Sequence, residues 1–409
     1  MTDQPTDLTL AKLPLAGLVV LDISTYIAAP AASVVLSDFG ADVIKVEGLD
    51  GDPNRFMVNN GAYPSSAANY PWLLDSRNKR SLAIDLKQQP ARAALDRLIA
   101  KADIAIVNYP LPVRQRLRLR WDDLRAANAR LIYASLTGYG EAGPDVDRPG
   151  FDVNAYFARS GIVDGAMYEG MAPNFPVPAQ GDRATAMTIV AGVLLALLHR
   201  QKTGEGSEIA TSLLANGVWA NGILAQAALA GAFIGHRPPR TRPRNPISNT
   251  YRSADGRWFV MTLLREDILW SALCAATGLP ELERDARFDS TAKRKASTAE
   301  LAAIFEARFL TKSWAEWKPI LTAHGLVYSE IQTLQDLPND RQIAANGIFV
   351  ETGDAQVPRT IANPINASFA AKRGSGPAPA LGQHSDEVLR WAGVSEQEIA
   401  ALRAASAIK

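Results

Sequence analysis

The sequence predicts an α/β protein with a Rossmann-like, doubly wound parallel sheet and a second, smaller α+β domain. Three observations support this fold class. Between residues 18 and 139, short Val-, Ile- and Leu-rich runs alternate with helix-length amphipathic segments, as in parallel strands joined by crossover helices. The 409 residues are enough for two domains. A segment rich in Pro and Arg at 235–246 separates this region from a predicted hairpin and further helices.

Five apolar runs are the expected strands of the large sheet. They read LVVLDIS (18–24), DVIKVE (42–47), SLAIDL (81–86), IAIVNY (104–109) and LIYASLTGY (131–139). Apolar residues spaced by three and four predict helices between them, at 31–39, 90–101 and 121–129. No GxGxxG follows the first strand, where the sequence reads DISTYIAAPAAS, so the layout does not imply a dinucleotide-dependent redox enzyme.

The second region begins after a long helical stretch expected at 212–234. The next segment, GHRPPRTRPRNP, contains four prolines and cannot form a regular helix, so it is expected to be a linker or lid. Its four arginines suit a solvated connector better than an anion clamp: Arg237, Arg240, Arg242 and Arg244. Farther on, Asp255 and Gly256 stand between two β-like runs and predict a hairpin.

A capping box marks one helix of the smaller domain, because Ser313 and Glu316 have the required spacing. From these signals we expect a large Rossmann-like domain over residues 1–225. A linker and small α+β domain follow over 226–330. The remaining chain, 331–409, is expected to return to the large domain.

Composition excludes several function classes. Lys plus Arg number 43 against 42 Asp plus Glu, and a formal charge of +1 provides no field for nucleic acid or an anionic membrane. One cysteine excludes an internal disulfide, and four scattered histidines lack metal-ligand spacing, so no metal is expected. The N-terminus lacks the features of a signal peptide, and the apolar stretch 186–198 is shorter than the ~18 residues of a membrane span. We therefore expect a cytoplasmic protein with one deeply buried helix.

That helix carries the best candidate for chemistry, Asp182, near its N-terminal end. The expected apolar face consists of Met187, Val190, Ala191, Leu194, Leu197 and Leu198. The positive end of the helix dipole should keep the Asp182 carboxylate ionised, and Gly181 before it should allow a ligand to approach the backbone. A carboxylate nucleophile and a plain N-terminal cap both account for this local pattern.

Several longer motifs follow one another along nearly the whole chain. They are PLAGLVVLDISTYIAAPAASVVLSDFGADVIKVE, RNKRSLAIDLK, the GYGxxGPxxxRPGxD stretch at 138–152, the GD of Gly181 and Asp182, HRQKTGEG, and LGQHSDEVLRWAGVSEQEIAAL. In this order they resemble the family III CoA-transferases, of the formyl-CoA transferase and carnitine CoA-transferase type.

The resemblance implies a mechanism and an assembly. Asp182 would be the nucleophile, and CoA would pass from an acyl-CoA donor to a carboxylic acid acceptor through a covalent aspartyl intermediate. A CoA thioester would be the co-substrate, with no prosthetic group. Two chains would form an interlinked homodimer. The implied CoA contacts are Ile27, Ile84, Asp85, Leu86, Lys87, Asn108, Tyr109 and Arg116.

Each of these contacts also has an ordinary structural explanation. Ile27 and Ile84 could be core residues, Tyr109 an aromatic at a strand end, and Arg116 one of several solvated arginines. Ile27 is also a departure from the formyl-CoA transferases, which have glutamine there, and this argues against oxalate or formate as substrate.

Two other functions remain open. The related α-methylacyl-CoA racemases use the same aspartate with a histidine in a GHDxxY context, but this sequence reads GFDVNAY, with Phe151 at the histidine position. Phenylalanine cannot exchange a proton, so racemisation would lose one of its two bases. The other alternative is a non-catalytic protein that binds CoA thioesters.

Overall fold

The computed structural model describes residues 12–58, 61, 63–177 and 179–409, and its chain forms two compact units. The large unit comprises the chain up to Ile162, Phe175–Gln226 and Ala344–Lys409. The small unit comprises Val163–Asn174 and Ala227–Ile343. Most of the N-terminal segment in which no signal peptide is expected, residues 1–11, lies outside the described residues.

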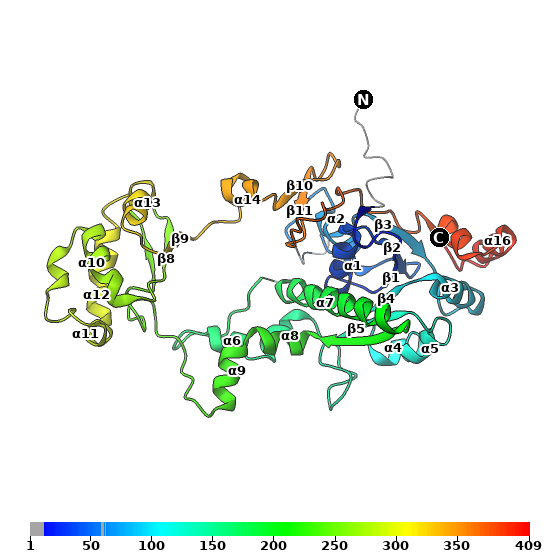
Figure 1. Cartoon of the computed structure of the whole chain (residues 1–409), viewed down its shortest axis with the longest axis horizontal. Coiled ribbons are helices and arrows are strands. Elements are labelled where there is room, and N and C mark those ends of the chain that lie inside the picture. The colour runs from blue at the N-terminus through cyan, green and yellow to red at the C-terminus, as the bar shows by residue number, and fades with distance from the viewer. Residues whose placement is uncertain (1–11, 59–60, 62, 178) are drawn as a thin grey trace. The chain divides into compact units, whose positions relative to one another are not determined.

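A six-stranded parallel sheet forms the centre of the large unit, in the order β3-β2-β1-β4-β5-β6 (Figure 1). The strands are β1 (Val19–Ile23), β2 (Asp42–Glu47), β3 (Lys79–Ala83), β4 (Ile104–Val107), β5 (Ile132–Thr137) and β6 (Ser207–Ser212). The predicted α/β class and its five strands are confirmed. The sixth, the polar edge strand SEIATS, was not predicted.

Helices cover both faces of this sheet. On one face α1 (Ala28–Asp38) packs on the strands and α7 (Gln180–Thr203) packs on α1, β5 and β6. On the other face the core includes residues of α3 (Gln89–Lys101), α15 (Ser385–Ala392) and α16 (Glu396–Ala404). The remaining elements of this unit are η2 (Pro53–Phe56), α2 (Tyr70–Ser76), α4 (Leu111–Leu117), α5 (Trp121–Arg125), the π-helix η3 (Asp152–Ala158), α8 (Leu213–Ala220), β10 (Phe349–Glu351) and β11 (Arg359–Ile361).

Helix α7 is buried along a different face from the one predicted. Its buried residues are Gly181, Thr185, Ala186, Ile189, Val190, Val193, Ala196 and Arg200. Leu194, Leu195 and Leu198 are exposed, so the expected face and the expected deep burial were wrong. Small side chains line the buried face because α1, which is buried along its whole length, packs closely against it.

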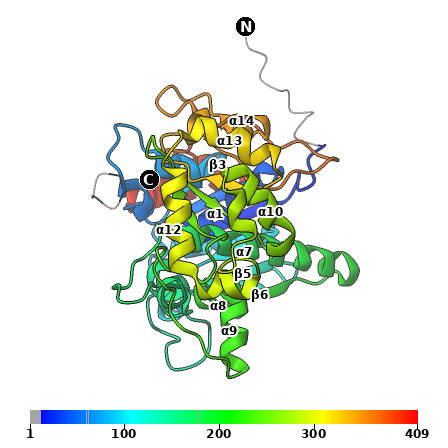
Figure 2. The ribbon, with the colours of Figure 1, turned by 90° about the vertical axis from the view of Figure 1, so that its left-hand side faces the viewer.

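The small unit is a three-stranded antiparallel sheet with helices. Strands β7 (Thr250–Arg252) and β8 (Trp258–Met261) form the predicted hairpin around Gly256, and β9 (Tyr328–Glu330) pairs with β8. Its other elements are α10 (Glu266–Thr277), η4 (Pro280–Glu283), α11 (Thr291–Ala296), α12 (Thr298–Phe309), α13 (Trp314–Ala323) and η5 (Leu337–Asn339) (Figure 2). The predicted capping box at Ser313 is present, with Glu316 accepting its backbone N–H at 2.8 Å.

The segments that join the units contain three short helices: α6 (Ile162–Ala166), α9 (Gly222–Leu229) and α14 (Arg341–Ala345). The long helix expected at 212–234 is therefore two helices, α8 and α9, separated at Asn221. The Pro- and Arg-rich segment is neither helix nor strand, and its Arg240 pairs with Glu306 of α12 at 2.7 Å.

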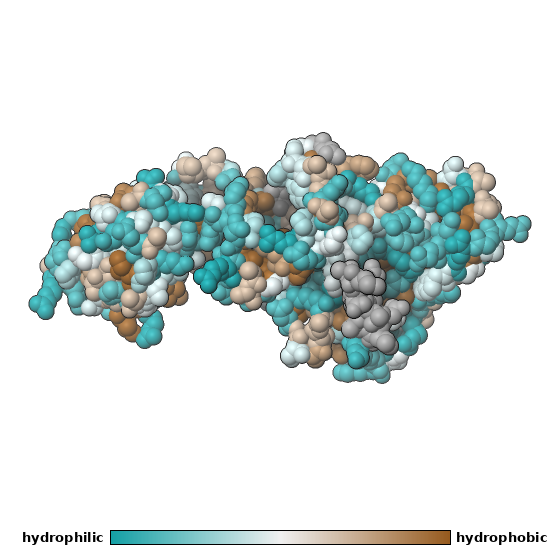
Figure 3. Space-filling view, turned by 90° about the horizontal axis from the view of Figure 1, so that it is seen from above, coloured by the Kyte–Doolittle hydropathy of each residue, from teal (hydrophilic) through white to brown (hydrophobic). Residues whose placement is uncertain are grey.

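The surface seen in Figure 3 is mainly hydrophilic, with apolar residues in small groups. Among the described residues one helix, α7, is long and apolar enough by length and composition to cross a membrane. One side of this helix packs on α1, β5 and β6.

Candidate active site

The strand order reverses between β1 and β4, and ligands of doubly wound folds bind at such a switch point, beyond the carboxyl ends of the strands. At this point Asn108 bonds the backbone of Thr25 twice, accepting its N–H at 2.9 Å and donating to its carbonyl at 2.7 Å. A cavity of about 160 Å³ opens here. Its lining includes Thr25, Tyr26, Ile27, Asn108, Gly138, Arg148, Phe151, Asp182 and Leu213.

Asp182 reaches this cavity from the first turn of α7. The helix starts at Gln180, after Ala179, whose backbone is left-handed with φ of 73°. Asp182 is therefore the third helical residue and not an N-cap. Among the described residues that line the cavity, Asp182 carries the only carboxylate.

The electrostatics of Asp182 differ from the expectation. Burial, followed by the negative charges of Asp152 and Asp75, raises its pKa to about 7, although Arg183 opposes the shift. The helix dipole thus does not keep this carboxyl fully ionised, because desolvation and two nearby carboxylates act against it. Near pH 7 both protonation states of Asp182 are populated.

Gly181 has a different role from the one predicted. A Cβ added there would lie 2.5 Å from Cγ of Tyr156, so the ring of Tyr156 already fills the space beside the glycine. The missing side chain lets η3 pack against the start of α7 and gives no opening to a ligand.

Phe151, which stands where the GHDxxY context has its histidine, lies on the cavity wall. Its ring is half exposed and makes an edge-to-face contact with Tyr26, with ring centroids 5.2 Å apart. Tyr26 is itself in the left-handed region, with φ of 65°. Within the described part of the chain, the cavity lining contains no histidine.

The residues implied to contact CoA fall into two groups. Ile27 and Asn108 line the Asp182 cavity. Five others line a second cavity of about 300 Å³ beyond β2 and β3: Ile84, Asp85, Leu86, Lys87 and Tyr109. Arg116 is exposed on α4 and lines neither cavity.

Buried charges hold the turn between β1 and α1. Lys45, in the middle of β2, pairs with Asp52 at 2.8 Å and with Asp22 of β1 at 3.6 Å. Lys79 of β3 pairs with the other oxygen of Asp22 at 2.8 Å. Asp52 in turn accepts the backbone N–H of Tyr26 at 3.0 Å, so this network supports the cavity wall. Sequence reasoning missed it because these charges lie in or beside runs that read as apolar strands.

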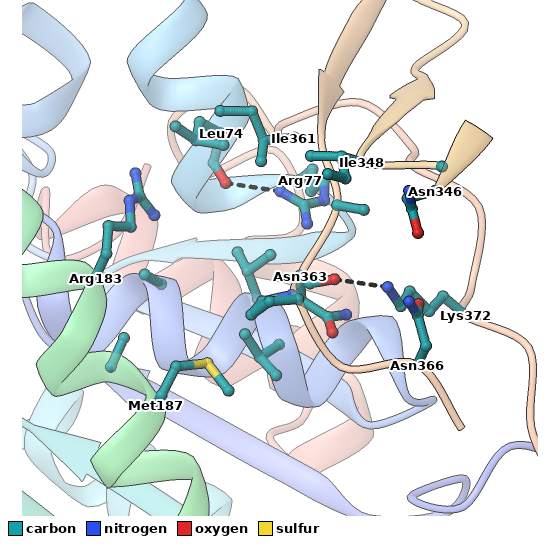
Figure 4. Close-up of a pocket in the computed structure, with 17 residues that line it drawn as sticks. Leu74, Arg77, Arg183, Met187, Asn346, Ile348, Ile361, Asn363, Asn366 and Lys372 are labelled. Atoms are coloured by element: carbon teal, nitrogen blue, oxygen red, sulfur yellow. Dashed lines mark hydrogen bonds between the residues drawn. The ribbon is translucent and has the colours of Figure 1, made fainter. Parts of the chain in front are cut away.

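A larger apolar cavity, of about 560 Å³, lies elsewhere in the large unit (Figure 4). Its cations have partners within the chain: Arg77 with Asp38, Arg183 with Asp75, and Lys372 with the carbonyl of Asn363. It contains no carboxylate among its described lining residues and is not the candidate active site. The described residues also include no group of three acidic, His or Cys side chains that could hold a metal ion.

Two further residues act on Asp182 and were missed: Asp152 and Asp75. The same carboxylates affect Tyr63: burial, then the charges of Asp75, Asp182 and Asp152, raise the pKa of its hydroxyl to about 12. Only Asp152 had a signal in the sequence, as the last residue of the GYGxxGPxxxRPGxD motif.

Known proteins resemble this chain along nearly its whole length. The model of CoA-transferase family III matches residues 15–385. The chain is 30% identical over 390 residues to (R)-2-hydroxy-4-methylpentanoate CoA-transferase of Clostridioides difficile, covering 94% of this chain and 97% of that protein. It is 31% identical over 395 residues to cinnamoyl-CoA:phenyllactate CoA-transferase of Clostridium sporogenes, covering 94% of each.

Solved structures show the same fold. A CAIB/BAIF family protein from Brucella suis has a TM-score of 0.82 at 28% identity, covering 93% of this chain and 99% of that one. Rv3272 from Mycobacterium tuberculosis has a TM-score of 0.79 at 29% identity, covering 92% and 99%. The chain is therefore an enzyme of CoA-transferase family III.

Proposed function

We propose that this enzyme moves CoA from an acyl-CoA donor to a carboxylic acid acceptor through a covalent intermediate on Asp182. The observation that supports this most is the place of Asp182, the single carboxylate lining the described switch-point cavity. Its pKa of about 7 leaves a large ionised fraction at neutral pH. Its basicity makes it a better nucleophile than an ordinary carboxylate.

In the proposed mechanism, CoA is transferred in four successive nucleophilic attacks. The Asp182 carboxylate attacks the thioester carbonyl of the donor, which forms a mixed anhydride and releases CoA thiolate. The thiolate attacks the aspartyl carbonyl of the anhydride, which releases the donor acid and leaves an aspartyl-CoA thioester. The acceptor carboxylate then attacks this thioester, and the thiolate attacks the acceptor carbonyl of the new anhydride. Acceptor-CoA leaves and the Asp182 carboxylate is restored.

The two cavities that contain the implied CoA contacts both lie at the carboxyl ends of strands of the large sheet. We propose that it occupies the cavity lined by Ile84 to Lys87 and Tyr109, with its thiol directed to Ile27, Asn108 and Asp182. The exposed cations Lys87 and Arg116 are proposed to hold its phosphates. We propose the cytoplasm as the site of the reaction.

A thioester exchange panel tests this function. The purified protein is mixed with cinnamoyl-CoA or succinyl-CoA and with free 2-hydroxy acids and dicarboxylic acids, in D₂O, and new thioesters are identified by mass spectrometry. We expect at least one new acyl-CoA, formed in proportion to donor consumed and without deuterium at the α-carbon. Binding of thioesters without exchange would instead indicate a binding protein. Deuterium uptake at the α-carbon would indicate a racemase, whether it occurs as fast as CoA transfer or in the absence of transfer.

We also propose that the enzyme is an interlinked homodimer. Leu195 and Leu198 of α7, Trp219 of α8 and Ile223 of α9 are all more than half exposed. Large apolar side chains that one chain leaves exposed are often buried at interfaces between subunits. Native mass spectrometry at micromolar concentration is expected to show a dimer, and Trp219→Glu should shift it toward monomer. Gln201→Glu, at an exposed polar position of α7, is the matched control. A wild-type protein that is only monomeric would contradict the proposal.

A further inference from the structure

The apolar cavity of about 560 Å³ has room for a small molecule (Figure 4). It is lined by α1, α2, α7 and the segment 346–372, and we call it the α1–α7 cavity. It shares α1 and α7 with the Asp182 cavity, but the two have no described lining residue in common. Its volume is within the range of small-molecule sites, so the large unit has a second place where a ligand fits, separate from the candidate nucleophile.

Most of the wall of the α1–α7 cavity is apolar. Val34 and Val35 of α1 and Ala186 of α7 are buried residues that line it. Ile348 and Ile361, which come from the segment 346–372, are 42% and 49% exposed. A ligand with a hydrocarbon part would remove this apolar surface from water, and its binding would be favoured for that reason.

One side of the cavity carries a connected cluster of polar groups. Arg77 donates to a carboxylate oxygen of Asp38 at 2.8 Å, and the side-chain amide of Asn363 donates to the same oxygen at 2.9 Å. Lys372 donates from Nζ to the backbone carbonyl of Asn363 at 2.6 Å (Figure 4). The cluster therefore contains two cations and one carboxylate.

Lys372 is the cation whose charge has no ionic partner. Arg183, the third cation of the wall, is paired with Asp75. Within the described part of the chain Lys372 forms no ion pair, and its one hydrogen bond is to a carbonyl oxygen. An ammonium group has three N–H donors, so two of them remain for a ligand. Burial lowers the pKa of Lys372, although the charge of Asp38 opposes this shift, and a bound anion would favour its charged form.

We propose that the α1–α7 cavity binds an amphipathic monocarboxylate, with its carboxylate on Lys372 and its hydrocarbon body along Val35 and Ile361. A single unpaired positive charge matches one negative charge better than two. An uncharged hydrocarbon would fill the apolar part but would leave the ammonium without an anion. Free acids of this class are also the acceptors and released products of the proposed transfer. The site itself does not depend on Asp182 being the nucleophile.

Isothermal titration with decanoate tests the site, with decanol as the uncharged analogue and hexanoate as the short one. The purified full chain is used without CoA. Decanoate should bind at least about tenfold more tightly than decanol, because a hydrogen bond to a charged group contributes that much. Hexanoate should bind more weakly by about fourfold for each methylene removed. Lys372→Met should weaken decanoate by about tenfold or more and leave decanol nearly unchanged.

Three further variants place the ligand. Lys202→Met, the same substitution at an exposed position near the end of α7, should bind decanoate like the wild type. Ile348→Trp adds a large side chain to the cavity wall and should weaken decanoate and decanol alike. Asp182→Asn should keep the wild-type affinity for decanoate, because Asp182 does not line this cavity. If Lys372→Met does not fold, Lys372→Gln is used for the same measurement.

Several outcomes would overturn the site. They are a wild type that does not bind decanoate or binds decanol as tightly, full decanoate affinity in the Lys372 variant or in Ile348→Trp, and loss of decanoate binding in Asp182→Asn. The last result would place the acid in the Asp182 cavity. CoA transfer by Asp182→Asn would instead overturn the proposed function and would leave the α1–α7 site in place.

Discussion

Replacement of Asp182 by alanine or asparagine is expected to abolish CoA transfer while the fold and the affinity for free CoA survive. Alanine removes the nucleophile, and asparagine leaves a poor one of nearly the same shape. Loss of a catalytic nucleophile lowers kcat by about 10⁴-fold or more in other enzymes that use covalent catalysis. Asp182→Glu keeps the charge but displaces it by roughly 1 Å, and such a displacement can cost about a hundredfold.

The raised pKa of Asp182 also predicts how these variants change the stability of the protein. Burial, with Asp152 and Asp75, raises the folded-state pKa of Asp182 to about 7, above the usual range of an unfolded aspartate. Folding therefore favours the protonated form, and this contribution to stability is lost as the pH rises through about 7. A neutral asparagine avoids that loss, so Asp182→Asn should be at least as stable as the wild type at pH 8.

Direct trapping completes the test of Asp182. The enzyme is mixed with an acyl-CoA that the exchange panel identifies as a donor, treated with borohydride or hydroxylamine, digested and mapped. Modification is expected on the peptide that contains Gly181 and Asp182. Gln180→Ala, in the same turn of α7, should be trapped like the wild type. Normal turnover by Asp182→Ala, or an adduct on another carboxylate, would contradict the proposed mechanism.

Strands with a clear apolar run in the sequence could be predicted, and strands without one could not. Strand β2 was placed to the residue, because DVIKVE is a short apolar run between turns. Strand β3 ends at Ala83, earlier than predicted, because the chain beyond it pairs with the C-terminus through Ile84 and Ile408. The edge strand β6 pairs only with β5 and alternates polar residues, so it lacked the apolar run of a buried strand.

Only those features of the candidate site that depend on neighbouring residues in the sequence could be predicted. Asp182 was found from its position before an apolar helix and from the family resemblance. Its raised pKa could not be found in this way, because the shift arises from burial in the fold and from Asp152 and Asp75, which lie far from Asp182 along the chain. The buried face of α7 was also misjudged. Several of its leucines are exposed, and the helix period alone does not tell which of two apolar faces meets the core.

Lys45→Met is expected to lose much of the stability of the fold. This substitution removes a cation from the buried network of Asp22, Lys45, Asp52 and Lys79. Lys45 is fully buried between Asp22 and Asp52, and methionine has a similar size but no charge. Removing one member of a buried ion pair leaves an uncompensated charge and typically costs about 3–5 kcal/mol. We expect the free energy of unfolding from urea titration to fall by about that amount at pH 7. Lys202→Met, at an exposed position near the end of α7, should change it by less than about 0.5 kcal/mol.

The pH dependence of this effect distinguishes a charge effect from a packing effect. Burial alone would raise the pKa of Asp22, but Lys45 and Lys79 hold it well below its usual range. Asp22 therefore contributes stability above its unfolded pKa of about 3.9, and that contribution is lost as the pH falls through its lower folded pKa. In Lys45→Met the Asp22 carboxyl loses one of its two cationic partners and should protonate at a higher pH, so the stability difference from the wild type should narrow as the pH falls from about 6 to about 4. If the difference in unfolding free energy stays constant over this pH range, lost packing is the cause. If Lys45→Met is as stable as the wild type at pH 7, the buried charge network contributes little to the stability of the fold.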